Sequence, residues 1–294
     1  MLSRLIPGTR GILGVVTAML MFAIMDSFAK DLLQRYPTPL VVWARFASQT
    51  VLIMVIVGPA LRRHLKTNHL GLQLGRSALH LTANTLFFSA LTAMTLADAS
   101  AVLQTAPLLI TIFAALILGE RVGILRWTGV LVGLFGALII IRPGFEVFQP
   151  AALLVLGASA CLALFQIIVR MIGAHDGLWT TMFYSGLVGT LVMSAVVPFY
   201  WVSPTLTDGL VMLTFGWIGC VGHTALVWGL TQAPASQLAP YNYANFLWAL
   251  VLGLVIFGEI PDVVTFLGTA LILGAGLYNW HRERMHELRA LGAR

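Results

Sequence analysis

The sequence predicts an all-α integral membrane protein whose ten transmembrane helices form a 5+5 inverted-topology repeat, with the N- and C-termini cytoplasmic. Three observations lead to this fold class: an apolar composition, ten apolar runs, and a correspondence between the two halves of the chain. Of the 294 residues, 59% are hydrophobic and 10% are charged. Ordinary soluble domains are about 45–50% apolar and about 25% charged, because their surface must be wetted. The composition therefore excludes a soluble enzyme, a nucleic-acid binder, a disordered chain and a disulfide scaffold.

Ten apolar runs account for most of the chain, and each is close to the roughly 20 residues that a membrane-crossing helix needs. They cover residues 11–33, 39–57, 77–95, 99–118, 124–141, 151–169, 179–199, 209–231, 235–257 and 265–280. The runs are continuous, without the alternation of a lipid-facing β-barrel strand. The first run follows Arg4 and Arg10 but has no small-residue cleavage site after it, so we expect a retained span rather than a signal peptide.

The positions of the cations predict the orientation. When the N-terminus is placed in the cytoplasm, thirteen of the seventeen Lys and Arg residues fall in cytoplasmic segments, as the positive-inside rule requires. Arg35 and Arg142 fall outside, and Lys30 and Arg45 lie within spans. The net charge of +6 is thus mainly a signal of topology. The basic segment 58–76 is expected to be a cytoplasmic loop, with contact to anionic lipid as the alternative.

The two halves of the chain correspond at a nearly constant offset of 139–140 residues. The clearest matches are Ala23, Asp26 and Lys30 with Ala163, Gln166 and Arg170, and Gly119-Glu120 with Gly258-Glu259. A repeat of five helices crosses the membrane an odd number of times, so its second copy is inverted relative to the first. We expect one five-helix repeat over residues 1–145, a second over 146–280, and a basic cytoplasmic tail over 281–294.

Several motifs resemble those of a known family. They are Ala97-Asp98-Ala99-Ser100, Pro107, Gly119-Glu120-Arg121, Trp127 and Gly129 in the first half, and Ala233-Pro234-Ala235-Ser236 and Gly258-Glu259 in the second. This set is similar to the signature of the EamA family, which belongs to the drug/metabolite transporter (DMT) superfamily, and within it to the YddG-type amino-acid exporters. The resemblance implies a central cavity lined by spans 1, 3, 4, 6, 8 and 9, with spans 5 and 10 at the periphery.

Two charged residues, Asp26 and Lys30, lie inside the first span, where charges are costly and therefore informative. They are four residues apart on one helix face, in the acid-first order that favours an ion pair. One interpretation is a mutually neutralising pair that faces the bundle interior. The other makes Asp26 a proton-coupling or amine-binding site. Arg45, near the start of the second span, is expected to extend its side chain to the membrane interface.

Uncharged polar side chains in other spans are candidates for a substrate site. They are His80 and Asn84 in the third span, Gln104 in the fourth, Gln166 in the sixth and His223 in the eighth. Asn84 and His223 occupy matching positions of the repeat, and His80 lies one turn from Asn84 on the same helix face. Such groups can hold a zwitterion weakly enough to release it, whereas hydrogen bonding between helices is the alternative.

The ninth span adds aromatic and helix-breaking residues: Pro240, Tyr241, Asn242, Tyr243 and Trp248. Their rings can hold an ammonium group or pack an apolar side chain, with an interfacial aromatic belt as the alternative. Pro240, and Pro107 at a comparable depth of the fourth span, are candidate helix breaks with a role in gating.

We expect structural roles for two glutamates at span ends and for two glycines within the fifth span. Glu120 and Glu259 each end a span, and we expect them to order the adjoining turns. Gly129 and Gly133 form a small-residue face in the fifth span, suited either to a dimer surface or to internal packing.

Together these features predict a secondary transporter that works by alternating access through a cavity between the repeats. The resemblance implies export of amino acids, aromatic and other neutral ones over a broad range, or of related small metabolites. The chain has no Walker-type phosphate loop for ATP use, and no Gly-x-Ser-x-Gly or His-Glu-x-x-His motif of an enzyme. The alternative function is proton-coupled export of cationic drugs or quaternary amines, with Asp26 as the coupling carboxylate.

The expected partners follow from that function. They are a small-molecule substrate and membrane lipid, without a cofactor, a metal ion or nucleic acid, and the oligomeric state stays open. We expect a multi-pass protein of the bacterial inner membrane.

Overall fold

The computed structural model describes residues 7–58, 67, 69–119, 123–142, 150–172, 178–232 and 238–292. In these residues all regular structure is helical, as a bilayer requires of a chain that must satisfy its own backbone hydrogen bonds. The elements are α1 (Pro7–Leu33), α2 (Thr38–Val57), α4 (Leu70–Leu91), α5 (Leu96–Leu103), α6 (Ala106–Ile117), α7 (Ile124–Ile141), α8 (Ala151–Ile172), α9 (Leu178–Val196), η4 (Val197–Tyr200), α10 (Leu206–Gln232), η5 (Ala239–Tyr243), α12 (Ala244–Phe257) and α13 (Val263–Gly292).

Helices occupy each of the ten predicted runs. Within the described residues, eight helical segments are long and apolar enough to cross a membrane, and Trp127–Ile141 of α7 is a shorter apolar helix. The remaining helix, α4, is less apolar because polar side chains such as Gln73, Arg76 and His80 interrupt it. The expected tail over 281–294 begins as a continuation of α13, which runs to Gly292. Ten crossings and cytoplasmic termini stay predictions.

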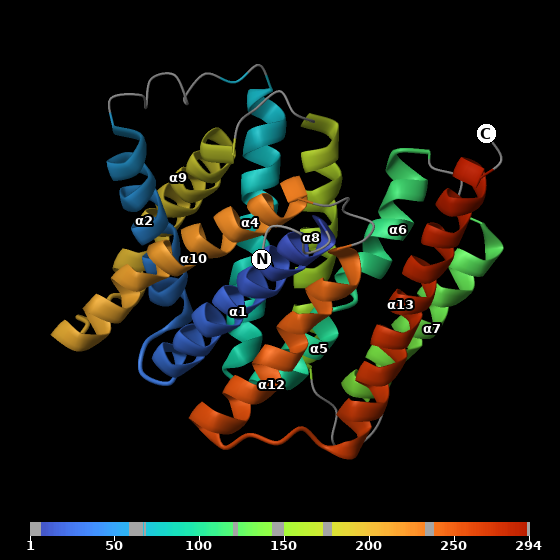
Figure 1. Ribbon diagram of the computed structural model, residues 1–294. Helices are drawn as coiled ribbons and strands as arrows, with labels where there is room; N and C mark the ends of the chain where they lie inside the picture. Colours follow the sequence, from blue (N-terminus) through green and yellow to red (C-terminus); the bar gives the residue numbers. More distant parts are fainter. Residues whose placement is uncertain are drawn as a thin grey trace, which may run out of the picture.

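The helices pack in pairs that are far apart in the sequence (Figure 1). α1 lies along α10, α4 along α8, α2 along α9, and α7 along α13. α7 and α13 stand together at one side of the molecule, beside α6. The buried side chains form one large apolar core, to which α7 and α13 also contribute, with two smaller clusters beside it.

The interface between α7 and α13 depends on glycine. A Cβ atom at Gly136 would lie 2.6 Å from the backbone oxygen of Gly268, so the two backbones touch there. Gly129 faces the side chain of Asn279, and Gly133 faces Leu108 and Ala275. The small-residue face of Gly129 and Gly133 is therefore used for packing inside the chain, the second of the two expected roles.

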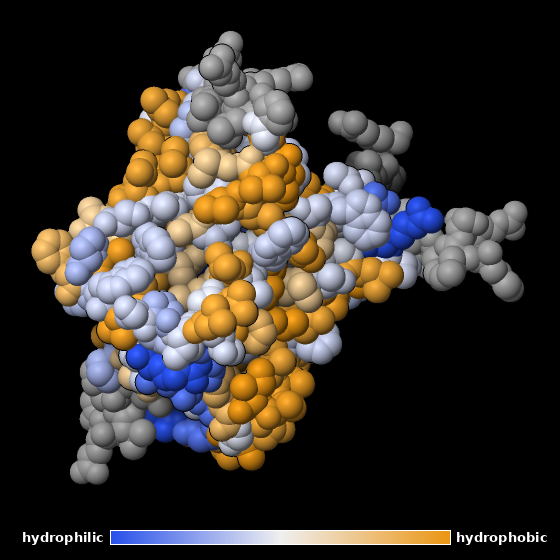
Figure 2. Space-filling model, turned by 90° about the vertical axis from the view of Figure 1, so that its left-hand side faces the viewer, coloured by the Kyte–Doolittle hydropathy of each residue, from blue (hydrophilic) through white to orange (hydrophobic). Residues whose placement is uncertain are grey.

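The outside of the bundle is apolar. Side chains such as Val55, Leu116, Phe135 and Val255 are more than half exposed, and Figure 2 shows apolar residues over much of the face in view. Exposed apolar surface on this scale is costly in water and is suited to the hydrocarbon core of a bilayer.

Candidate functional site

Four ionisable side chains from four helices meet in the interior of the bundle. They are Asp26 of α1, Arg45 of α2, His80 of α4 and His223 of α10, here called the central cluster. Asp26, Arg45 and His80 are each no more than 8% exposed, and His223 is half-buried. Arg45 interacts electrostatically with Asp26 and with both histidines. Buried ionisable groups in a membrane protein mark substrate or ion pathways, so this cluster is the candidate functional site.

Phenylalanine rings surround the two histidines. The His80 ring lies 5.6 Å from the ring of Phe46 and 5.4 Å from the ring of Phe165. The His223 ring meets Phe22 edge to face at 5.0 Å. The cluster is thus a small set of polar groups in an aromatic setting, as is usual for small-molecule sites.

Arg45 does not extend to the membrane interface, so that expectation is wrong. Its Nη1 donates to the Sδ atom of Met25 at 3.0 Å. Its guanidinium carbon lies 5.9 Å from the centroid of the Phe46 ring and 5.7 Å from that of Phe88. These contacts come from α1, α2 and α4. The side chain therefore points into the bundle, where it cannot reach the interface.

The predicted cytoplasmic loop over 58–76 is also wrong at Arg76. It lies on α4, which begins at Leu70, and it is 1% exposed. Its Nη2 donates to the backbone oxygen of Thr181 at 2.6 Å and to Oγ of Ser185 at 3.3 Å. The guanidinium therefore ties α4 to α9. The spacing of four residues from Arg76 to His80 was the signal that both share one helix face.

The predicted Asp26–Lys30 ion pair is not formed. Lys30 Nζ pairs instead with Oε1 of Glu259 at 2.5 Å and donates to the backbone oxygen of Met94 at 2.8 Å. Glu259 Oε2 also accepts from the backbone N–H of Leu96, the first residue of α5, at 3.0 Å. Glu259 thus orders a helix start and supplies the charge that Lys30 needs. Glu120 lies outside the described residues.

Three other predicted site residues differ in burial and in their distance from the cluster. Asn84 is half-buried one turn from His80, and its Nδ2 donates to the backbone oxygen of His80 at 2.7 Å. Gln166 of α8 and Tyr241 of η5 are exposed. The structure therefore brings Asn84 close to the central cluster and leaves Gln166 and Tyr241 outside it.

The remaining candidates gather where two helices are interrupted. α5 ends at Leu103 and α6 begins at Ala106, next to Pro107. In the second half, Pro240 lies in the 3-10 turn η5 that precedes α12. Gln104 Nε2 donates to the backbone oxygen of Asn242 across the two interruptions at 3.4 Å.

Two aromatic residues pack beside the second interruption. The Tyr243 side chain fills the space over Gly276 of α13, where a Cβ atom could not fit. Trp248 of α12 buries its indole Nε1 without a hydrogen-bond partner in the described residues. Neither residue is among the ring contacts of the central cluster.

Ion pairs tie helices together at one end of the bundle, where α1, α4, α7 and α12 end. We call it the ion-paired end. The Lys30–Glu259 pair lies here, beside a surface pocket of about 350 Å³. The pocket is lined by Lys30, Leu33, Gln34, Leu91, Thr92, Ala93, Met94, Thr95 and Glu259. The pair therefore closes the space between the end of α1 and the connection from α12 to α13.

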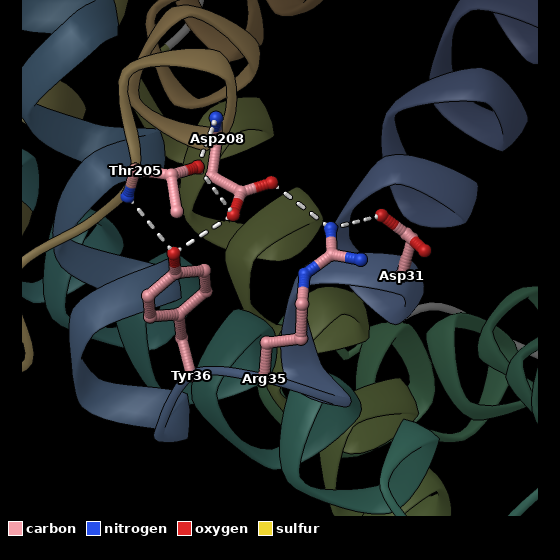
Figure 3. Close-up of polar contacts among 5 residues, drawn as sticks. All are labelled: Asp31, Arg35, Tyr36, Thr205 and Asp208. Atoms are coloured by element: carbon pink, nitrogen blue, oxygen red, sulfur yellow. Dashed lines mark hydrogen bonds and ion pairs between the residues drawn. The ribbon is translucent and has the colours of Figure 1, made fainter.

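A second network joins the α1–α2 connection to the start of α10 (Figure 3). Arg35 Nη2 lies 3.0 Å from Oδ1 of Asp208 and 2.6 Å from Oδ2 of Asp31. Tyr36 donates its hydroxyl to Oδ2 of Asp208 at 2.8 Å and accepts the backbone N–H of Thr205 at 3.1 Å. Asp208 thus holds Arg35 and Tyr36 against the first turn of α10.

A third contact joins α7 to α13 at the same end. Arg142, the residue after α7, forms an ion pair with Asp262, just before α13. Burial raises the pKa of Asp262, but the hydrogen bonds from Arg142 and Thr265 together hold this pKa below its ordinary value. All four ion pairs among the described residues therefore lie at the ion-paired end.

Apolar helices of membrane-spanning length around a buried charged cluster define the class of multi-pass membrane transport proteins. The comparisons agree with this class. The profile of the EamA-like transporter family matches residues 9–142 and 149–279. The chain belongs to the EamA family, and is a membrane transporter of the EamA/DMT type.

Named relatives transport different molecules. The chain is 26% identical to an S-adenosylmethionine uptake transporter of Rickettsia bellii, over 90% of this chain and 92% of the relative. It is 27% identical to a pseudopaline exporter of Pseudomonas aeruginosa (90% and 94%) and 29% identical to a riboflavin transporter of Vibrio cholerae (90% and 90%). A protein crystal structure shares the fold, with a TM-score of 0.64 at 20% identity over 95% of this chain and 99% of that chain.

Proposed function

We propose that this protein is a secondary transporter that exports amino acids, aromatic and other neutral ones, or related small metabolites across the bacterial inner membrane. The observation that carries the proposal is the central cluster. An acid, a guanidinium and two imidazoles lie together inside the bundle, and the described residues form no ion pair among them. Opposite charges side by side match the two ends of a zwitterion.

Alternating access would follow from an inverted repeat with units over 1–145 and 146–280. The helix pairing supports this repeat, because an offset of 139–140 residues converts the α1–α10 pair into the α8–α4 pair. The same offset relates Gly119 to Gly258, and both have a φ of 67°. Two units of like fold and opposite orientation can exchange conformations, which exposes a midplane site to each side in turn.

The named relatives support a small molecule as the cargo. S-adenosylmethionine is a derivative of an amino acid, so its uptake by a relative agrees with a zwitterion as cargo. The relatives include both an uptake transporter and an exporter. The direction of export therefore depends on the resemblance to YddG-type proteins, since a carrier follows whatever gradient it meets.

One experiment tests the cargo directly. The purified protein is reconstituted in liposomes, and counterflow is measured with a panel of amino acids, quaternary amines and sugar phosphates, with and without an imposed pH gradient. We expect counterflow of neutral amino acids, and none of sugar phosphates. Counterflow of quaternary amines alone would contradict the proposal.

Proton-coupled export of cationic drugs is the second candidate function. It is favoured by Asp26, a buried carboxylate with no hydrogen bond among the described residues, as a proton-binding group would need. If this function is right, Asp26→Asn abolishes the response of transport to the pH gradient. Unchanged transport and unchanged pH dependence in Asp26→Asn liposomes would remove this candidate.

A further inference from the structure

We propose that Arg45 binds the carboxylate of the cargo, with His80 beside it, while Asp26 binds the ammonium group. The cargo class is then α-amino acids and those derivatives that keep both groups free. The inference rests on the proposed transport function and deepens it. What it adds to that function is the residue, Arg45, that recognises the carboxylate.

The buried guanidinium of Arg45 interacts electrostatically with Asp26 but forms no ion pair with it. Within the described part of the chain, no acidic side chain lies within ion-pair distance of its guanidinium. Among these residues its Nη1 bonds only to the thioether of Met25, which is a weak acceptor. Its Nε is buried and has no hydrogen-bond partner in the part of the chain that the structure describes. A buried donor without an acceptor is costly, so this guanidinium is suited to an anionic ligand.

His80 presents a second unpartnered atom next to Arg45. Its Nδ1 is buried without a hydrogen bond from the described residues, and both residues lie against the ring of Phe46. The planar guanidinium fork matches the two oxygens of a carboxylate. The nearby negative charge of Asp26 disfavours a phosphate dianion, so a monoanion is the expected ligand.

Asp26 provides the complementary end of the site. It is 8% exposed, and it accepts no hydrogen bond from the described residues. Lys30, one turn away, is already engaged by Glu259 and Met94. The Asp26 oxygens are therefore available for an ammonium group, and the rings of Phe22, Phe46, Phe88 and Phe165, which contact the other residues of the cluster, offer apolar contacts to the side chain of the cargo.

Four probes that share one phenyl ring separate the two ends of the cargo. L-phenylalanine has both charges, L-phenylalanine amide and phenethylamine lack the carboxylate, and 3-phenylpropionate lacks the amine. Binding is measured by thermal stabilisation of the purified full-length protein, and transport by competition against labelled L-phenylalanine in liposomes. Arg10→Gln is the matched control, because Arg10 is an exposed arginine of α1.

In the Arg45 variants we expect a loss of binding for the probes that carry a carboxylate. Arg45→Gln should weaken the binding of L-phenylalanine and 3-phenylpropionate on the order of 10- to 100-fold. It should weaken the binding of the amide and of phenethylamine by no more than about twofold. Arg45→Lys keeps the charge but not the fork, so it should show a smaller loss with the same pattern. Asp26→Asn should weaken the binding of the three probes that carry an amine and leave the binding of 3-phenylpropionate unchanged. Arg10→Gln should change none of these values.

Other outcomes separate the inference from the proposed function. An equal loss for all four probes in both Arg45 variants, or an unchanged preference for carboxylates, overturns the inference even if the wild type transports amino acids. Stabilisation by 3-phenylpropionate that depends on Arg45, in a protein that transports no amino acid, keeps the carboxylate site and overturns the proposed cargo. A wild type that binds none of the four probes overturns both.

Discussion

Buried charged residues in this protein differ in whether the chain itself supplies their partners. Lys30 has Glu259 and the backbone oxygen of Met94, and Arg76 has the backbone oxygen of Thr181. These residues hold helices together. Arg45 and Asp26 lack comparable partners among the residues that the structure describes, and an incompletely satisfied polar group inside a protein calls for a functional explanation. Arg76 also interacts electrostatically with both histidines of the central cluster, so it borders the site as well as joining helices.

At the residue scale, His223 should affect transport without affecting folding. His223→Ala removes a cluster imidazole that is half-buried against Phe22. We expect amino-acid counterflow to fall by about tenfold, the loss of one hydrogen bond to a charged cargo. Asn84→Ala should act in the same direction.

The control for these variants is Gln166→Ala, because Gln166 is an exposed polar residue of α8. It should leave counterflow unchanged. The yield of monodisperse protein measures folding for all three variants. If yield and counterflow fall together in His223→Ala, the imidazole serves the packing of α10 rather than the cargo.

At the scale of elements, close helix contacts depend on missing side chains. α1 and α10 meet at Gly14 and Gly229, where a Cβ atom at Gly14 would lie 2.7 Å from the Cα of its neighbour. α7 and α13 meet at Gly136 and Gly268. Helix association in lipid lacks a hydrophobic driving force and relies on such close packing.

Gly268→Ala should therefore destabilise the protein by about 1–3 kcal/mol, the usual cost of overpacking a well-packed contact. Its Cβ would lie 2.6 Å from the backbone oxygen of Gly136. Gly274→Ala is the matched control on the same helix, since nothing lies within 4 Å of its Cβ position; it should leave stability unchanged or raise it by about 0.5–1 kcal/mol. Thermal midpoints of the purified variants measure both, and equal midpoints would contradict the packing argument.

At the scale of the whole molecule, the ion pairs close one end of the bundle. They tie α1 to the connection before α13, the α1–α2 connection to α10, and α7 to α13. With the N-terminus in the cytoplasm, this end would face outward. If cargo leaves on that side, we expect at least some of these pairs to break.

Glu259→Gln should weaken the contacts at the ion-paired end, so that the interior becomes more accessible from that end. A cysteine introduced as Asn84→Cys, in a chain whose Cys161 and Cys220 are replaced by Ala, reports access to a membrane-impermeant thiol reagent. We expect Glu259→Gln to increase the labelling rate by about tenfold, because one charge-assisted hydrogen bond is lost. Asp31→Asn is the control, since the Asp31–Arg35 pair joins neighbouring residues of one hairpin. Equal labelling of both variants would contradict the closure.

Much of the helix arrangement could be predicted from the sequence, because membrane helices are determined by local apolarity. The predicted runs fall on helices from α1 to α13. The start of α4 could not be placed, since Gln73 and Arg76 read as loop residues before their burial was known. Pairings between helices were less predictable still. Lys30 has Asp26 in reach along the helix, yet it takes Glu259, a residue 229 positions away.

The sequence by itself determined the membrane class, the helical runs and the family to which the chain belongs, because apolar length and motif spacing are properties of neighbouring residues. Only the tertiary structure decided which polar groups meet. It turned Arg45 from an expected interface residue into a member of the central cluster, and it separated Gln166 and Tyr241 from that cluster. The physical reason is that the environment of a buried charge is set by helices from distant parts of the chain, whose packing no local pattern records.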